Sequence, residues 1–303
     1  MNSEIFSGFD TVALIVVAVS FGLGGGLVFA ASIFPSWRRA APEFRRLYLQ
    51  EFIIVGAILV PAALGNWAFL VLLLAIEYRC VLELFDAFAL NKAVVIRWIA
   101  TIAGAGLIVI ALFVSQILLP ALLVSVAAVL IISASIERGH VSSATVVAVG
   151  SLFFPAVLVA LTALLRAGYN GLGWIIFVYA TIEMNDTFAL LVGKLVGRRP
   201  FLPRLSPRKT AEGFIAGILV GGAIGYGASR YLLDLSPLSA VTVVVCTLAA
   251  GTMGDLVVSA VKRLRNRKDF LPVLSAHGGV LDIYDSFLFA APFVLLVRTV
   301  AGF

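Results

Sequence analysis

Five acidic side chains in the second half of the chain lie within or at the ends of stretches that are otherwise apolar. Glu183 and Asp186 are three residues apart, Asp282 and Asp285 are three residues apart, and Asp255 lies in a third apolar stretch. A spacing of three places both members of a pair on one face of a helix. An acid at membrane depth costs roughly 3 kcal/mol or more unless it is paired, binds a metal or reaches water, which makes these residues candidates for function.

Basic residues gather beside these acids. The stretch KRLRNRKDFLPVLSAHGGVLDIYD, residues 262–285, contains five Lys or Arg residues, and residues 194–212 contain six more. Asp255, Ser259 and Lys262 follow one another at steps of four and three, so one stripe of a helix would carry an acid, a hydroxyl and a cation. These three side chains are predicted to line one polar pocket.

The available ligands indicate which metal such a pocket would hold. The two cysteines, Cys80 and Cys246, lie in apolar runs, and the only histidines are His140, beside a predicted loop, and His277. Carboxylate oxygens suit Mg²⁺ rather than Zn²⁺. Magnesium held by aspartates beside Lys and Arg is typical of sites that bind and transfer phosphate groups.

Two neighbouring glycines, Gly278 and Gly279, precede a predicted helix start and would let backbone N–H groups approach a phosphate. Each feature also has a simpler interpretation. Asp282 and Asp285 could cap a helix, Asp255 could pair with a lysine, and the basic loops could serve only as topology signals. The stretch at 22–26 and the ladder Gly213, Gly217, Gly221 and Gly225 indicate close helix packing.

The composition requires a membrane protein, because 62% of the 303 residues are hydrophobic, 13% are charged and mean hydropathy is +1.11. We expect an all-α, polytopic integral membrane protein with about nine to ten transmembrane helices and a polar pocket at the cytoplasmic face. The opening MNSEIFSGFD contains no Lys or Arg, so the first apolar segment is expected to remain as a helix. The predicted segments are 10–34, 51–64, 66–86, 94–115, 117–135, 141–165, 173–193, 213–231, 237–260 and 282–301, the second and third forming either a tight hairpin or one broken element.

The distribution of positive charge predicts the orientation. The linkers after the first, third, fifth, seventh and ninth segments hold 17 of the 22 Lys and Arg residues, which places them in the cytoplasm. The expected location is the bacterial inner (plasma) membrane. We divide the chain into N-terminal helices, 1–170, and a C-terminal catalytic region, 171–303. The short basic loops do not form a nucleic-acid-binding module.

Two stretches resemble a known family. The pattern Ser259-x2-Lys262-Arg263-x4-Lys268-Asp269-x7-His277-Gly278-Gly279-x2-Asp282-x2-Asp285-Ser286 resembles the signature of phosphatidate cytidylyltransferases, also called CDP-diacylglycerol synthases. A second stretch, Asn185-Asp186-Thr187 followed by GKLVGRRP and by Ser206-Pro207-x-Lys209-Thr210-x-Glu212-Gly213, is similar to the other cytoplasmic motif of that family, and Gly254-Asp255 matches its acidic pair.

The resemblance implies that CTP and phosphatidic acid, or a related phospholipid, are converted to CDP-diacylglycerol and pyrophosphate with Mg²⁺. By this analogy the catalytic candidates are Asp255, Asp282, Asp285 and Lys262, and the metal candidates are Asp255, Asp282, Asp285 and Asp186. The expected substrate-binding residues are Asn185, Asp186, Ser206, Lys209, Glu212, Ser259, Arg263, Lys268, Asp269, His277, Gly278 and Gly279. The expected partners are CTP, the phospholipid and the bilayer, with a homodimer left open and no nucleic acid.

Two positions depart from the family pattern. Ser275-Ala276 stands where the family usually has Pro-Gly, and Ile283 stands where it has Arg. A transporter or flippase, or a catalytically weak or silent relative that binds lipid phosphates, are the alternatives. A transporter would place its site near the membrane midplane rather than at one face.

Overall fold

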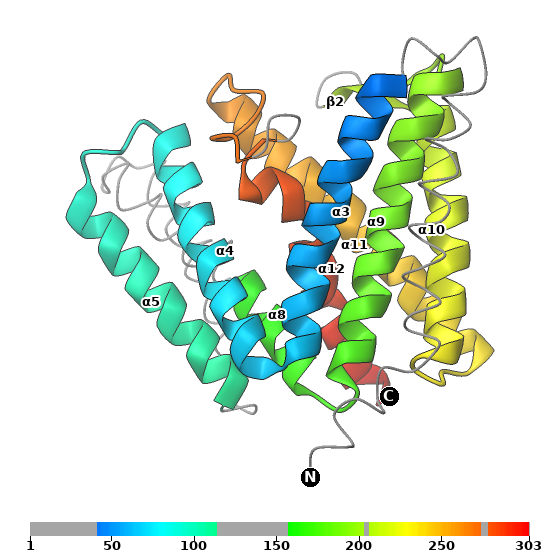
Figure 1. The fold of residues 1–303 in the computed structure, drawn as a ribbon, viewed down its shortest axis with the longest axis horizontal. Coiled ribbons are helices and arrows are strands. Elements are labelled where there is room, and N and C mark those ends of the chain that lie inside the picture. The colour runs from blue at the N-terminus through cyan, green and yellow to red at the C-terminus, as the bar shows by residue number, and fades with distance from the viewer. Residues whose placement is uncertain (1–40, 114–156, 203–205, 274–277, 303) are drawn as a thin grey trace.

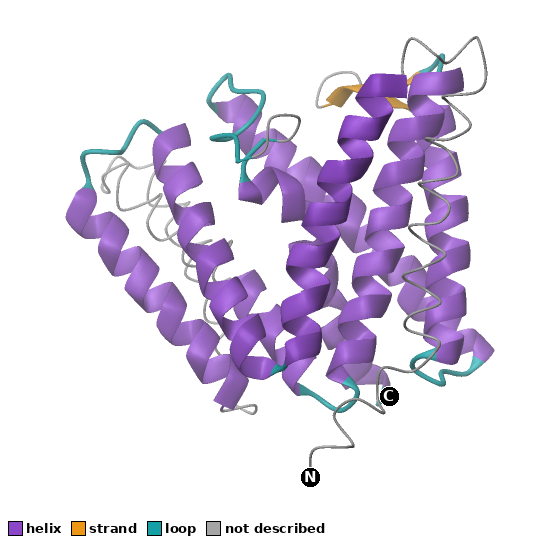
Figure 2. Cartoon of the chain, in the orientation of Figure 1, coloured by secondary structure: helices purple, strands orange, loops and turns teal. Residues whose placement is uncertain are grey.

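A computed structural model of the chain describes residues 41–113, 157–202, 206–273 and 278–302 (Figure 1). Helices make up nearly all of this part, with one short hairpin of strands (Figure 2). The helices are α3 (Ala41–Leu64), α4 (Asn66–Ala87), α5 (Val94–Phe113), α8 (Val157–Ala167), α9 (Gly171–Val196), α10 (Ala211–Tyr231), α11 (Pro237–Leu264) and α12 (Val280–Ala301). The strands β1 (Pro200–Leu202) and β2 (Ser206–Thr210) pair antiparallel.

Five of these helices, α5 and α9 to α12, are long and apolar enough to cross a membrane. The prediction of an all-α membrane protein is therefore confirmed. The count of nine to ten helices stays a prediction, because segments 10–34 and 117–135 and most of 141–165 lie outside the described residues. The β1–β2 hairpin was not predicted from the sequence, and it forms within the basic linker between α9 and α10.

The second and third predicted segments form a tight hairpin rather than one broken helix. α3 and α4 run in opposite directions and meet at Gly65 (Figure 1). Gly65 has a φ of 116°, a backbone conformation that residues with a Cβ rarely adopt. One glycine therefore suffices to reverse the chain between two packed helices.

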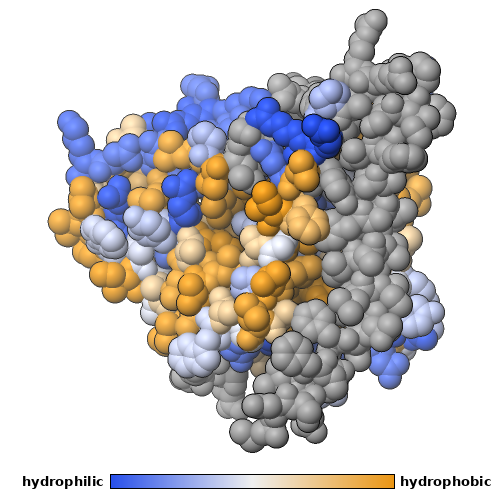
Figure 3. All heavy atoms as spheres, in the orientation of Figure 1, coloured by the Kyte–Doolittle hydropathy of each residue, from blue (hydrophilic) through white to orange (hydrophobic). Residues whose placement is uncertain are grey.

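The two ends of the helix bundle differ in charge. The α4–α5 loop, the β1–β2 hairpin and the α11–α12 loop lie together at one end, which we call the basic end (Figure 1). Hydrophilic side chains gather along this edge, and hydrophobic ones cover the middle of the same face (Figure 3). Arg267 forms an ion pair with Asp86, which joins the α11–α12 loop to the end of α4.

Arginine side chains at the opposite end donate hydrogen bonds to backbone carbonyl groups. Arg166 donates to the carbonyl oxygen of Ala62 at 2.8 and 3.0 Å, and Arg298 donates to that of Tyr169 at 2.9 Å. Arg230 donates to the carbonyl of Leu235. The guanidinium groups of this end thus satisfy carbonyls near helix ends and loops.

The predicted glycine ladder packs α10 directly against α9. A Cβ on Gly217 would lie 2.5 Å from the carbonyl oxygen of Asn185, and one on Gly221 would lie 2.8 Å from that of Thr181. Gly213 and Gly225 are equally close to α9. Small residues allow this backbone contact, so the ladder fixes the position of the α9 face that carries Asn185.

We expect Gly217→Ala to destabilise the protein, although alanine is the better helix former. Overpacking of a tight contact costs about 1–3 kcal/mol, which exceeds the roughly 1 kcal/mol of helix propensity gained. Gly227→Ala is the matched control, since a Cβ there has no atom within 4 Å. Thermal unfolding in detergent should show a lower Tm for Gly217→Ala only; equal Tm values would contradict the close α9–α10 contact.

Labelling of single cysteines should place the α9–α10 and α11–α12 linkers on one side of the membrane. Arg198→Cys and Arg265→Cys, made after replacement of Cys80 and Cys246 by alanine, substitute exposed residues of the basic end. An impermeant thiol reagent should reach both from the same side and reach Asp234→Cys from the other. Labelling of the first two from opposite sides would be incompatible with this fold.

Candidate active site

Three carboxylates and one lysine come together just inside the basic end. Asp186 projects from α9, Asp255 from α11 and Asp285 from α12, while Lys209 lies on β2. Lys209 forms an ion pair with Asp255, and all three acids interact electrostatically with its ammonium group. The acids also interact with one another. We call these four residues the acidic cluster.

The acidic cluster contains more negative than positive charge. Burial lowers the pKa of Lys209, but the neighbouring carboxylates of Asp255, Asp186 and Asp285 outweigh it and hold that pKa above its usual value. The lysine is therefore charged at neutral pH. Asp285 is only 6% exposed, whereas Asp186 has a large exposed surface and Asp255 a side chain that is 20% exposed. Two of the three acids therefore retain exposed surface.

Neighbouring polar groups orient these acids. Asn185 donates to Asp186 at 2.9 Å, and both N–H and hydroxyl of Ser286 donate to Asp285, at 2.5 and 3.2 Å. Ser286 also interacts with Asp186 of α9, so it lies near acids of two helices. Ser286 is buried and was not among the predicted site residues. Its position directly after Asp285 in the sequence could have indicated that it contacts the site.

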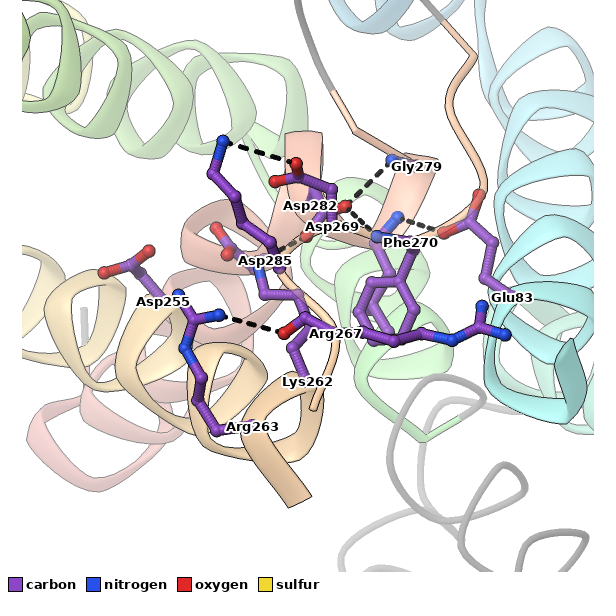
Figure 4. A network of polar contacts seen from close by, with 12 residues as sticks. Glu83, Asp255, Lys262, Arg263, Arg267, Asp269, Phe270, Gly279, Asp282 and Asp285 are labelled. Atoms are coloured by element: carbon purple, nitrogen blue, oxygen red, sulfur yellow. Dashed lines mark hydrogen bonds and ion pairs between the residues drawn. The ribbon is translucent and has the colours of Figure 1, made fainter. Parts of the chain in front are cut away.

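Lys262 and Asp282 form a second, adjoining unit. Their side chains pair at 2.5 Å and are 11% and 9% exposed (Figure 4). The other oxygen of Asp282 accepts from the backbone N–H of Phe270 at 2.8 Å and of Gly279 at 2.9 Å. Asp282 thus caps the start of α12, which was the simpler of its two predicted roles.

The predicted stripe on α11 therefore divides between the two units. Asp255 pairs with Lys209 and Lys262 pairs with Asp282, while Ser259 is buried between them along the helix. Asp285 interacts electrostatically with both Asp255 and Lys262, so the units are adjacent.

The remaining predicted residues lie around the rim. Arg263 is exposed and donates to the carbonyl of Arg267 at 3.0 Å, and Lys268 and Asp269 pair with each other at 3.7 Å with both side chains 54% exposed. Glu212 accepts from the backbone N–H groups of Arg198 and Arg199 at 3.1 and 3.2 Å, which holds the turn before β1.

Three predicted features cannot be compared with the structure. His277 and Ser275-Ala276 lie outside the described residues, as does the side chain of Ser206, which begins β2. Ile283, the other departure from the family pattern, packs against the apolar core of the bundle.

Sequence reasoning missed Glu83 of α4. This carboxylate is fully buried and accepts from the backbone N–H groups of Val280 at 2.7 Å and Leu281 at 2.9 Å (Figure 4). The acid and its two partners are almost 200 residues apart in sequence, so no local pattern could reveal the contact.

The donor chemistry of the acidic cluster fits Mg²⁺. Within the described ranges, no three His, Cys, Asp or Glu residues are grouped closely enough to hold a metal ion by themselves. Magnesium does not need such a cage, since it is usually bound by one or two carboxylates together with waters and substrate phosphates. Asp186, Asp255 and Asp285 provide hard oxygen ligands and uncompensated negative charge.

Sequence similarity to known proteins extends over most of the chain. The sequence model of the "Cytidylyltransferase family" matches residues 45–301. A phosphatidate cytidylyltransferase of Bacillus subtilis (strain 168) is 39% identical over 127 residues, which are 41% of this chain and 46% of that protein. One of Aquifex aeolicus (strain VF5) is 35% identical over 146 residues, 48% of this chain and 54% of that protein. The chain thus spans about half the length of the curated relatives it matches.

Loss of the helix cap formed by Asp282 should lower the thermal stability of the protein. Asp282→Asn removes the charge that pairs with the buried ammonium of Lys262, and breaking a buried pair typically costs about 3–5 kcal/mol. Asp269→Asn, in the same loop, loses only a half-exposed pair and should cost about 1 kcal/mol or less. Thermal unfolding in detergent should therefore separate the two variants clearly. Similar Tm values would argue against a structural role for Asp282.

Proposed function

Because the chain belongs to the cytidylyltransferase family, we propose that it is a phosphatidate cytidylyltransferase, which converts CTP and phosphatidic acid to CDP-diacylglycerol and pyrophosphate. The observation that carries this proposal is the acidic cluster at the basic end: three carboxylates and a charged lysine, brought together from α9, β2, α11 and α12. The printed names of the similar bacterial proteins support it.

The proposed reaction requires the protein to align two phosphates and to neutralise their charge. An oxygen of the lipid phosphate attacks the α-phosphorus of CTP, a new P–O bond forms, and the bond to pyrophosphate breaks. The lipid phosphate is already anionic at neutral pH, so the site must align the two phosphates and neutralise their charge rather than remove a proton. No strong general base is needed among the residues of the site.

We assign roles by charge and accessibility. One or two of Asp255, Asp285 and Asp186 would hold Mg²⁺ together with waters and substrate phosphates, and the metal when bound would supply positive charge to the reacting phosphates. Lys209 stays protonated and binds a phosphate oxygen once CTP competes with Asp255 for its ammonium. The exposed Arg263 and Lys268 at the rim attract the nucleotide from solution.

The position of the site suits a substrate that stays in the membrane. Helices α10 and α11 expose large apolar side chains on their outer faces, including Leu219, Val241 and Val245, which belong in lipid. The acidic cluster lies at the basic end of the same helices, near the expected level of phospholipid headgroups. By the positive-inside rule this end faces the cytoplasm, where CTP is available. A transporter site at the midplane is not favoured by this placement.

Turnover should depend on divalent metal and on the acidic cluster. Purified protein given CTP, phosphatidic acid and Mg²⁺ should form a CDP-lipid, and chelation should stop it. Asp255→Asn keeps the size of the side chain but loses a charge, so we expect a loss of about 100-fold or more in kcat/KM, the scale seen when a key electrostatic group is removed. Asp234→Asn changes an exposed acid at the opposite end and should leave turnover unchanged.

The melting temperature of each variant shows whether the loss is catalytic. Asp255→Asn should stay within a few degrees of the parent protein, because Asp255 is partly exposed and its partner Lys209 can reach water. Full activity of Asp255→Asn, or metal-independent turnover, would refute the assignment of the acidic cluster.

A further inference from the structure

The N-terminus of α12 is closed by two carboxylates. Glu83 of α4 accepts from the N–H groups of Val280 and Leu281 at 2.7 and 2.9 Å, and Asp282 accepts from that of Gly279 at 2.9 Å. These N–H groups belong to the first turn, where a helix has no partners of its own. Carboxylates also interact favourably with the positive end of the helix dipole.

This arrangement changes the interpretation of the Gly278-Gly279 pair. A Cβ on Gly279 would lie 2.7 Å from Oε1 of Glu83, and one on Gly278 would lie 2.7 Å from Cγ of Asp282. The missing side chains therefore make room for two carboxylates of the protein. The first-turn amides predicted to approach a phosphate already donate to these acids.

Helix α12 is also held at a second point. A Cβ on Gly254 of α11 would lie 2.7 Å from the carbonyl oxygen of Asp285 and 2.7 Å from Cβ of Phe289. The backbones of α11 and α12 thus touch where they carry Asp255 and Asp285. A shift at the start of α12 would be transmitted to this crossing, since tightly packed helices have little free space to absorb it.

We infer that Glu83 is a positioning residue of the proposed cytidylyltransferase site, fixing the start of α12 and thereby the placement of Asp285 against Asp255. This inference rests on the proposed function for its catalytic consequence. Glu83 is fully buried, and its only described ion pair is the 3.5 Å contact with Arg79 one turn earlier. Its two bonds to α12 connect the first half of the chain to the helix that carries two of the predicted catalytic acids.

Glu83→Gln tests this role by replacing one accepting oxygen with an amide that donates. Either Val280 or Leu281 then loses its acceptor, so we expect kcat to fall by roughly 10-fold or more. KM for CTP should change little, because Glu83 does not contact the acidic cluster. Asp86→Asn is the matched control on the same helix: it weakens a partly exposed pair with Arg267 and should lower kcat by about fivefold at most.

A double-mutant cycle with Gly279 gives a readout that a merely structural role would not move. Gly279→Ala should lower kcat in the parent protein because its methyl group displaces Glu83. In Glu83→Ala the space is free, so adding Gly279→Ala should cause little further loss. Equal losses in both backgrounds would mean that Gly279 acts independently of Glu83, and would overturn the inference.

Hydrogen exchange separates this inference from the proposed function. Amides of residues 280–281 should exchange faster in Glu83→Gln than in the parent protein, with no substrate present, while α9 and α10 stay protected. If the parent protein forms no CDP-lipid, faster exchange still supports the role of Glu83 in holding the start of α12, and only the proposed function fails. Unchanged exchange overturns the role of Glu83 whatever the activity. If Glu83→Ala does not fold, the hydrogen exchange and the kcat of Glu83→Gln decide whether the inference about Glu83 holds.

Discussion

Partly compensated negative charge at the basic end of the helix bundle is the constraint on which the arrangement of the site depends. A carboxylate removed from water is tolerated only where hydrogen bonds or opposite charges compensate it. Asp282 has Lys262 and two backbone amides, and Glu83 has two amides and Arg79, so both are balanced within the protein. Among the residues that the structure describes, the acidic cluster itself contains one lysine for three acids, so its negative charge is only partly compensated there.

Close backbone contacts keep the cluster from relaxing. Gly217 and Gly221 set α10 against the face of α9 that carries Asn185 and Asp186, and Gly254 sets α11 against α12 beside Asp255. A glycine contact allows little sliding, because the approach is limited by backbone atoms rather than by flexible side chains. The close helix contacts therefore oppose the separation of acids that repel one another.

The sequence predicted features that depend on local pattern. Apolar stretches gave helices α9 to α12 nearly as the structure has them, spacing placed the glycine ladder on one face, and the charge of the linkers grouped them at one end. Partners that depend on tertiary contact were not predictable in this way. The pairing of Lys262 with Asp282 was not predicted, and Glu83 is remote in sequence from the amides it binds. The β1–β2 hairpin was missed because its residues form a short charged linker without a strand pattern.

The charge of the substrates explains why a site of acids is compatible with a reaction between anions. CTP and phosphatidic acid would both be repelled by three carboxylates and attracted by one lysine, so the acidic cluster alone opposes their binding. A divalent cation held by one or two of these acids would reverse that balance, and Mg²⁺ in proteins is usually bound together with waters and substrate phosphates. The exposed cations of the surrounding loops, which include Arg263, Arg265 and Lys268, would add a longer-range attraction for an anionic nucleotide. In the proposed reaction the distant cations would attract the substrates, and the nearby acids would favour a substrate that binds a divalent metal.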